Sequence, residues 1–245
     1  MKKLLVTLSV AALMAMPASL VLASDAHHAA PKDAAHSGHG GAHAAGAGIS
    51  GDEALKKLVD GNARFMKDDK TYTNWGAARR AELTKGQKPF AIVLGCSDSR
   101  VPPEHVFDQE LGDLFVVRVA GNVADTDEIA SIEYAVAHLG APLIIVLGHQ
   151  SCGAVKATID GAKDTEHIIN LVKKIDPAVK KAQATVKDKA GLLDAAIIEN
   201  AKGTAATLTQ KSSVIKEKVD KGEVKLTAGV YNLATGKVDL IDLKK

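Results

Sequence analysis

Two segments of this chain share one layout: an apolar run, a Leu-Gly pair, and then side chains that can bind metals. The first is F-A-I-V-L-G-C-S-D-S-R, from Phe90 to Arg100, and the second is L-I-I-V-L-G-H-Q-S-C, from Leu143 to Cys152. A short apolar run bounded by turn signals fits a strand buried on both faces of a parallel sheet. Ligands bind such sheets at the carboxyl ends of adjacent strands, where the chain order reverses. The two segments therefore predict an α/β fold with a site at one edge of its sheet.

Helical patterns surround these two strands. Residues Ser50 to Glu53 have capping-box spacing, and apolar residues then recur with helical period to about Lys67. The pattern predicts a mainly parallel α/β sheet covered by helices, with an N-terminal helical arm. The last long helical stretch, residues 163–220, predicts two or three helices with breaks near Pro177 and Gly191. The other expected elements are an extended arm at 71–79, helices at 81–85, 127–139 and 152–159, and strands at 90–95, 114–120, 224–231 and 237–241.

The first 23 residues have the pattern of a secretory signal peptide. A basic Met1-Lys2-Lys3 start precedes the apolar run Leu4–Ala15, and Val21-Leu22-Ala23 has the small residues of a cleavage site. The alternative is an uncleaved membrane anchor. That run is short for a bilayer span, however, and Pro17 follows it closely. We predict removal of residues 1–23, export to the periplasm, and no membrane span in the mature chain.

Residues 24–48 form a low-complexity tract of Ala, Gly and His. It has too few large apolar residues to offset the entropy of ordering, so a disordered tether is expected. The tract holds five of the nine histidines of the chain: His27, His28, His36, His39 and His43. Such tracts bind zinc, copper or nickel loosely, and a simple soluble spacer is the alternative. Residues 49–245 are then expected to form a single domain of ordinary size.

The charge of the mature chain argues against one class of partner. Removal of the signal peptide takes Lys2 and Lys3 from a total of 31 basic residues, which then equal the 29 acidic ones. A net charge near zero gives no electrostatic support for nucleic-acid binding.

The side chains after the two strands predict a zinc site. Cys96 and Cys152 offer thiolates, His149 an imidazole and Asp98 a carboxylate. Three protein ligands and an exchangeable fourth position are typical of catalytic zinc, and sulfur ligands favour zinc over magnesium or calcium. A Cys96–Cys152 disulfide is the alternative in an exported protein with two cysteines. A disulfide does not require Asp98, Arg100 and His149 beside its sulfurs, so the pattern favours the metal.

Asp98 and Arg100 project the same way from an extended segment, so we expect a charge-assisted hydrogen bond between them. Paired with Arg100, Asp98 leaves the fourth zinc position to water. Released from Arg100, Asp98 could bind the zinc itself and close the site. A zinc-bound water has its pKa lowered to about 7, which supplies hydroxide near neutral pH.

The same residues resemble a known family. C-S-D-S-R, followed by F-V-V-R, I-E-Y-A-V and G-H-x-x-C-G, is similar to the β-class carbonic anhydrases, and the resemblance runs from Glu53 to Tyr231. It implies four parallel strands plus a C-terminal edge strand. It also implies a homodimer or a larger assembly such as a tetramer, joined through N-terminal helices and sheet edges, with active sites in clefts at the subunit interface.

The resemblance also implies roles for single residues. Cys96, His149 and Cys152 would hold one zinc ion per subunit, with Asp98 as the fourth ligand in a closed state. Asp98 and Arg100 would form the catalytic dyad. Contacts to CO2 and bicarbonate are implied for Gln87, Phe115, Tyr134 and Gly153.

The chain departs from the family pattern at two places. Val93 replaces the tryptophan of an allosteric anion pocket, although Arg118 and Tyr231 match the other two residues of that pocket. Ala120 stands where a larger valine is usual in the substrate pocket. We therefore expect a zinc site that is open rather than switched by bicarbonate.

Together these patterns predict a zinc-dependent carbonic anhydrase that interconverts CO2 and bicarbonate through zinc-bound hydroxide. A carbonyl sulfide or carbon disulfide hydrolase on the same scaffold is one alternative. A non-catalytic exported metal-binding protein with a Cys96–Cys152 disulfide is the other.

Overall fold

The computed structural model describes residues 48–71, 74–186 and 188–243. The predicted signal peptide at 1–23 lies outside the described residues, as does the predicted tether at 24–48 apart from Gly48. Within the described part of the chain, no helix is long and apolar enough to cross a membrane.

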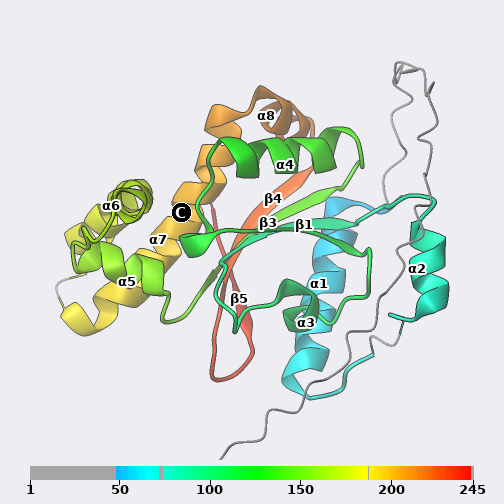
Figure 1. The fold of residues 1–245 in the computed structure, drawn as a ribbon, viewed down its shortest axis with the longest axis horizontal. Helices are drawn as coiled ribbons and strands as arrows, with labels where there is room; N and C mark the ends of the chain where they lie inside the picture. The colour runs from blue at the N-terminus through cyan, green and yellow to red at the C-terminus, as the bar shows by residue number, and fades with distance from the viewer. Residues whose placement is uncertain (1–47, 72–73, 187, 244–245) are drawn as a thin grey trace, which may run out of the picture. The chain divides into compact units, whose positions relative to one another are not determined.

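A five-stranded sheet with the order β2-β1-β3-β4-β5 forms the centre of the domain (Figure 1). Four strands are parallel: β1 (Ala91–Gly95), β2 (Leu114–Arg118), β3 (Leu143–His149) and β4 (Lys225–Tyr231). The fifth strand, β5 (Val238–Ile241), runs antiparallel to β4 at the edge. Every residue of β1 and β3 is buried, as the two apolar runs predict. The predicted α/β fold is confirmed, with four parallel strands and a C-terminal edge strand.

Helices cover both faces of this sheet (Figure 1). Alternate residues of β1 and β3 face opposite sides, so Leu94 and Ile144 enter one core and Val93 and Ile145 the other. Helices α4 (Thr126–Ala137), α7 (Lys189–Lys211) and α8 (Ser213–Asp220) cover the first side, and α1 (Gly51–Met66) and α3 (Pro103–Val106) the second. A third cluster joins α7 to α5 (Gly153–Ile159) and α6 (Glu166–Thr185). The remaining elements are α2 (Ala77–Leu83) and the 3₁₀ turn η1 (Ala120–Asn122).

The region from residue 163 to 220 contains three helices, within the predicted two or three, but one predicted break is wrong. Pro177 lies inside α6. The break predicted near Gly191 lies between Thr185 and Lys189, and the last two helices are separated at Ser212. An interior proline costs about 3 kcal/mol in helix stability. The buried stripe of α6 continues across Pro177, from Ile175 to Ala182, and burying Ile175 and Val179 at about 1.5–3 kcal/mol each offsets that cost. The predicted extended arm at 71–79 is also too long, because α2 already begins at Ala77.

Helix α1 lies close to the loop after α3, and a glycine permits the approach. A Cβ atom added at Gly61 would lie 1.8 Å from the carbonyl oxygen of Phe107. The next residue, Asn62, donates from its side-chain amide to Val106 O at 3.0 Å and to Gly236 O at 2.7 Å. These contacts hold α1 against the C-terminal end of α3 and the turn before β5.

Replacing Gly61 with alanine is therefore expected to destabilise the domain by about 2 kcal/mol, although helix propensity alone favours alanine by about 1 kcal/mol. Urea unfolding measures the change. The matched control is Gly203→Ala in α7, where an added Cβ meets nothing within 4 Å. That variant is expected to be neutral or slightly more stable. Equal stabilities for the two variants would contradict the close packing at Gly61.

Candidate metal centre

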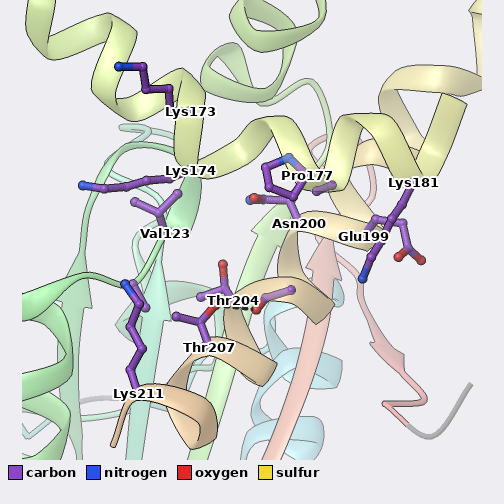
Figure 2. Close-up of a pocket in the computed structure, with 13 residues that line it drawn as sticks. Val123, Lys173, Lys174, Pro177, Lys181, Glu199, Asn200, Thr204, Thr207 and Lys211 are labelled. Carbon is purple, nitrogen blue, oxygen red and sulfur yellow. Dashed lines mark hydrogen bonds between the residues drawn. The ribbon is translucent and has the colours of Figure 1, made fainter.

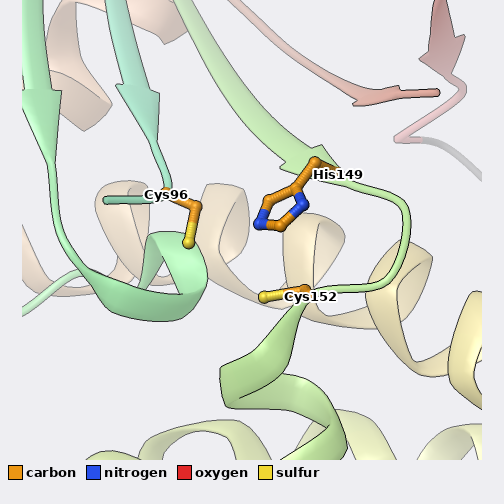
Figure 3. A group of neighbouring side chains, drawn as sticks. All are labelled: Cys96, His149 and Cys152. Carbon is orange, nitrogen blue, oxygen red and sulfur yellow. The ribbon is translucent and has the colours of Figure 1, made fainter. Parts of the chain in front are cut away.

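The carboxyl ends of β1 and β3 bring three metal-ligating side chains together (Figure 3). Cys96 follows β1, His149 ends β3, and Cys152 is the N-cap of α5. The two strands are parallel neighbours, and Ser151 turns the chain between His149 and Cys152 with a positive φ of 56°. The two Sγ atoms and a ring nitrogen of His149 all lie within 4.8 Å of one another. The structure thus gathers the three ligands that the sequence predicts.

The imidazole of His149 is oriented for a ligand that the protein itself does not supply. The side chain is fully buried, and Nδ1 lies 2.9 Å from the carbonyl oxygen of Gln150, to which its N–H donates. Nε2 is buried without a hydrogen-bond partner among the described residues. A buried polar atom left unpaired costs about 1–3 kcal/mol. A metal bound at Nε2 removes that cost, and a backbone carbonyl behind Nδ1 is the usual support of a ligating histidine.

Both cysteines are buried free thiols in this structure, so the predicted disulfide alternative is absent. A hydrogen bond from Cys152 holds the pKa of Cys96 well below its usual range, and the N–H of Gly121 also donates to Cys96 Sγ at 3.3 Å. The same hydrogen bond raises the pKa of Cys152. The pair therefore shares one proton. A divalent cation would displace it, because a coordinating thiol is deprotonated.

Asp98 lies beside this group and is paired with Arg100, as predicted. The guanidinium donates from Nε to Oδ1 at 2.9 Å and from Nη2 to Oδ2 at 2.7 Å, and the backbone N–H of Arg100 adds a third bond at 3.0 Å. These hydrogen bonds hold the pKa of Asp98 well below its usual range. Oδ2 of Asp98 lies 3.8 Å from Nε2 of His149. An ionised carboxylate thus stands at the edge of the metal centre.

Arg118 has a role that the sequence patterns missed. It ends β2 opposite Gly95, and its guanidinium donates to the carbonyl oxygens of Cys96 at 2.8 Å and of Asp98 at 2.5 Å. These two bonds fix the backbone that carries Cys96 and Asp98. The sequence gives little indication of this role, because an arginine at a strand end is common and the partners of Arg118 are backbone atoms.

Replacing Arg118 with methionine is expected to lower kcat by about 10- to 100-fold while the metal stays bound, as is usual for residues that support a metal site. The reason is that the loop with Cys96 and Asp98 loses both anchoring bonds. Metal content and steady-state kinetics check this expectation. The control is Arg80→Met in α2, whose guanidinium donates only to Trp75 O in the contacts described. Unchanged kcat in Arg118→Met would remove Arg118 from the positioning of the loop.

The other predicted site residues are spread over the chain. Gly153 is the first residue of α5, directly beside Cys152. Phe115 pairs with Ile92 of the neighbouring strand β1. Ile92 precedes Cys96 by four residues, so Phe115 lies about 13 Å from Cys96 along the strand direction. Its ring centroid lies 6.4 Å from that of Tyr134, which is 49% exposed on α4. Gln87 lines a separate surface pocket with Leu83 and Gly112 that contains none of the metal ligands. Within one chain, therefore, only Gly153 of these four adjoins the metal centre.

Comparison with known proteins decides the family. The family model for carbonic anhydrases matches residues 91–238, which include all three metal-ligating residues. The chain belongs to the carbonic anhydrase family. A carbonic anhydrase of Mycolicibacterium smegmatis is 42% identical over 193 residues, which cover 76% of this chain and 91% of that protein.

Solved structures place this carbonic anhydrase in the β class. The β-carbonic anhydrase CafA of Aspergillus fumigatus has 25% sequence identity and a TM-score of 0.62, over 79% of this chain and 91% of that one. A β-carbonic anhydrase of Sordaria macrospora, described as tetrameric, has 22% identity and a TM-score of 0.60, over 66% of this chain and 85% of that one. The protein is thus a β-carbonic anhydrase with a Cys-His-Cys metal site, and the alternative of a non-catalytic disulfide protein is wrong.

Proposed function

We propose that Cys96, His149 and Cys152 hold one zinc ion per subunit and that this site hydrates CO2 to bicarbonate. The observation that supports zinc most directly is the buried, unpartnered Nε2 of His149 with two sulfur atoms within 4.8 Å. Two sulfurs and one imidazole nitrogen match the ligand preference of zinc. When bound, zinc lowers the pKa of a coordinated water to about 7 and so supplies hydroxide at neutral pH.

The protein's own groups would orient the reactants around that site. Asp98 is ionised, so it can accept a hydrogen bond from a water molecule and turn the oxygen lone pair toward CO2. Arg100 keeps Asp98 away from the metal through its two side-chain bonds. Arg118 holds the loop that carries Cys96 and Asp98. The alternative state, in which Asp98 itself binds the metal, requires the Arg100 bonds to break.

The remaining substrate contacts are proposed to come from a second copy of the chain. Gln87 and the Phe115–Tyr134 pair do not adjoin the metal centre of their own chain, yet Tyr134 is half exposed. A homodimer, or a tetramer like that of the Sordaria macrospora relative, would place these side chains over the neighbouring metal centre. Sedimentation equilibrium tests the assembly. A purely monomeric and fully active protein would exclude this arrangement.

We further propose that residues 1–23 are removed as a signal peptide and that the enzyme acts in the periplasm. The support is the basic start, the apolar run and the small-residue cleavage pattern of the sequence. Residues 24–48 would then link the new N-terminus to the catalytic domain. Mass spectrometry of the fractionated, mature protein tests this proposal. A cytoplasmic protein that begins at Met1 would refute it.

The proposed reaction is tested by removing the metal. Zinc-loaded protein that starts at residue 49 is expected to hydrate CO2 at pH 7 and at pH 8.5, and a zinc chelator is expected to abolish both activities. Stopped-flow pH-indicator assays measure the rates. Activity only at the higher pH would mean that Asp98 binds the metal at pH 7. No activity in zinc-loaded, reduced protein would contradict the proposed function.

A further inference from the structure

A cavity of about 240 Å³ lies between α6 and α7, apart from the metal centre (Figure 2). Its walls include the apolar side chains of Val123 and Pro177 and the helical glycine Gly203. A Cβ atom added at Gly203 would meet nothing within 4 Å, so the missing side chain leaves this space open. The volume suits a small molecule, since one water molecule occupies about 30 Å³ of liquid.

The rim of the cavity is basic. Figure 2 shows Lys174 and Lys211 on one side of the cavity and Lys181 beside Glu199 on the other. Asp125 binds Lys174 at 2.6 Å and lies 3.7 Å from Lys211. With Lys173, four lysines therefore face two carboxylates, those of Glu199 and Asp125. The rim retains an excess of positive charge that matches a dianion.

Two buried polar side chains of α7 also reach the cavity. Asn200 and Thr204 are 4% and 5% exposed, and both belong to its lining. The Asn200 amide donates one hydrogen to Gly121 O at 2.7 Å, which leaves its second hydrogen for another acceptor. The N–H of Gly121 donates in turn to Cys96 Sγ at 3.3 Å. A molecule bound to Asn200 would thus be connected to a metal ligand through a single residue.

We propose that this cavity is a binding site for a small dianionic oxyanion of the phosphate class. Lysine ammonium groups on the rim supply the charge, and the Asn200 amide and the Thr204 hydroxyl supply neutral donors from the wall. The absence of a side chain at Gly203 supplies the space. The site is separate from the Cys-His-Cys centre and does not depend on the identity of the metal bound there.

Isothermal titration of the zinc-loaded protein with inorganic phosphate tests the proposal. One phosphate per chain is expected to bind, and Gly203→Leu is expected to weaken binding at least about tenfold because the leucine fills the cavity. The matched control is Gly191→Leu on the same helix. Gly191 is not part of the cavity lining, and a Cβ there makes an ordinary contact 3.5 Å from Val186 Cγ1.

A second pair of variants tests the role of the positive charge on the cavity rim. This test is informative even if Gly203→Leu does not fold. The double variant Lys173→Gln/Lys181→Gln is expected to weaken phosphate binding about tenfold, or about 1.4 kcal/mol, because two positive charges are removed from the rim. The control Lys216→Gln/Lys221→Gln removes the same charge from α8 and its C-cap, and neither residue belongs to the cavity lining. No phosphate binding would overturn the proposal. So would binding that Gly203→Leu leaves unchanged, or equal losses in the two double variants.

Discussion

Replacement of Cys152 with alanine is expected to empty the metal centre and to abolish CO2 hydration. Cys152 is 1% exposed and contributes one of the two sulfurs that lie within 4.8 Å of a His149 ring nitrogen. Structural zinc sites bind with about 10–16 kcal/mol in total, so one lost ligand of four costs about 3 kcal/mol, or about 100-fold in affinity. Zinc is then lost on dialysis against a weak chelator, and catalysis is lost with it.

The measurement is zinc per chain after dialysis, taken together with the hydration rate. Losing one buried sulfur should cost the fold only about 1 kcal/mol, so circular dichroism should show folded protein. The matched control is Ser97→Ala, an exposed position on the loop between Cys96 and Asp98, which is expected to keep both zinc and activity. Full zinc content in Cys152→Ala would remove Cys152 from the ligand set and leave Asp98 as the candidate replacement.

The metal centre was predictable from sequence because its ligands follow two strands of nearly identical pattern. Parallel neighbours end at the same edge of a sheet, so Cys96 and His149 had to lie close together once β1 and β3 were adjacent. The turn through Ser151 then returns Cys152 to the same point. No knowledge of the helices was needed for this part of the prediction.

The rest of the site depends on information that local patterns do not carry. Arg118 donates to backbone carbonyl oxygens. Every residue has such an oxygen, so the sequence does not show which residues Arg118 will bind. The predicted helix break at Pro177 is wrong because the tertiary packing of the buried stripe of α6 offsets the local cost of the proline. Gln87, Phe115 and Tyr134 could be assigned only by resemblance, because their proposed target belongs to another copy of the chain.

Replacement of Asp98 with alanine is expected to keep zinc but to lower kcat by about 10²- to 10⁴-fold, the usual contribution of a positioned proton acceptor. Asp98 is ionised because Arg100 donates to both of its oxygens. It lies 3.8 Å from His149 Nε2, close enough to orient a water molecule beside that nitrogen. Removing the carboxylate leaves all three metal-ligating side chains in place, so the loss appears in turnover and not in metal content.

The control is Asp160→Ala, which also removes a carboxylate paired with a basic residue, Lys156, but on the surface at the end of α5. An exposed pair of this kind contributes about 0–1 kcal/mol to stability, and the control is expected to be fully active. Stopped-flow hydration and zinc content of both variants give the comparison. Near-normal turnover in Asp98→Ala would remove Asp98 from the mechanism.

Arg100→Ala separates the two states proposed for Asp98. If Arg100 holds the carboxylate off the metal, its removal lets Asp98 bind zinc, so zinc affinity rises while turnover falls. The double variant Asp98→Ala/Arg100→Ala then loses the gain in affinity and has the turnover of Asp98→Ala alone, because the arginine acts through the carboxylate. If zinc affinity stays the same in Arg100→Ala, Asp98 does not compete with water for the metal. The arginine then serves only to orient the Asp98 carboxylate.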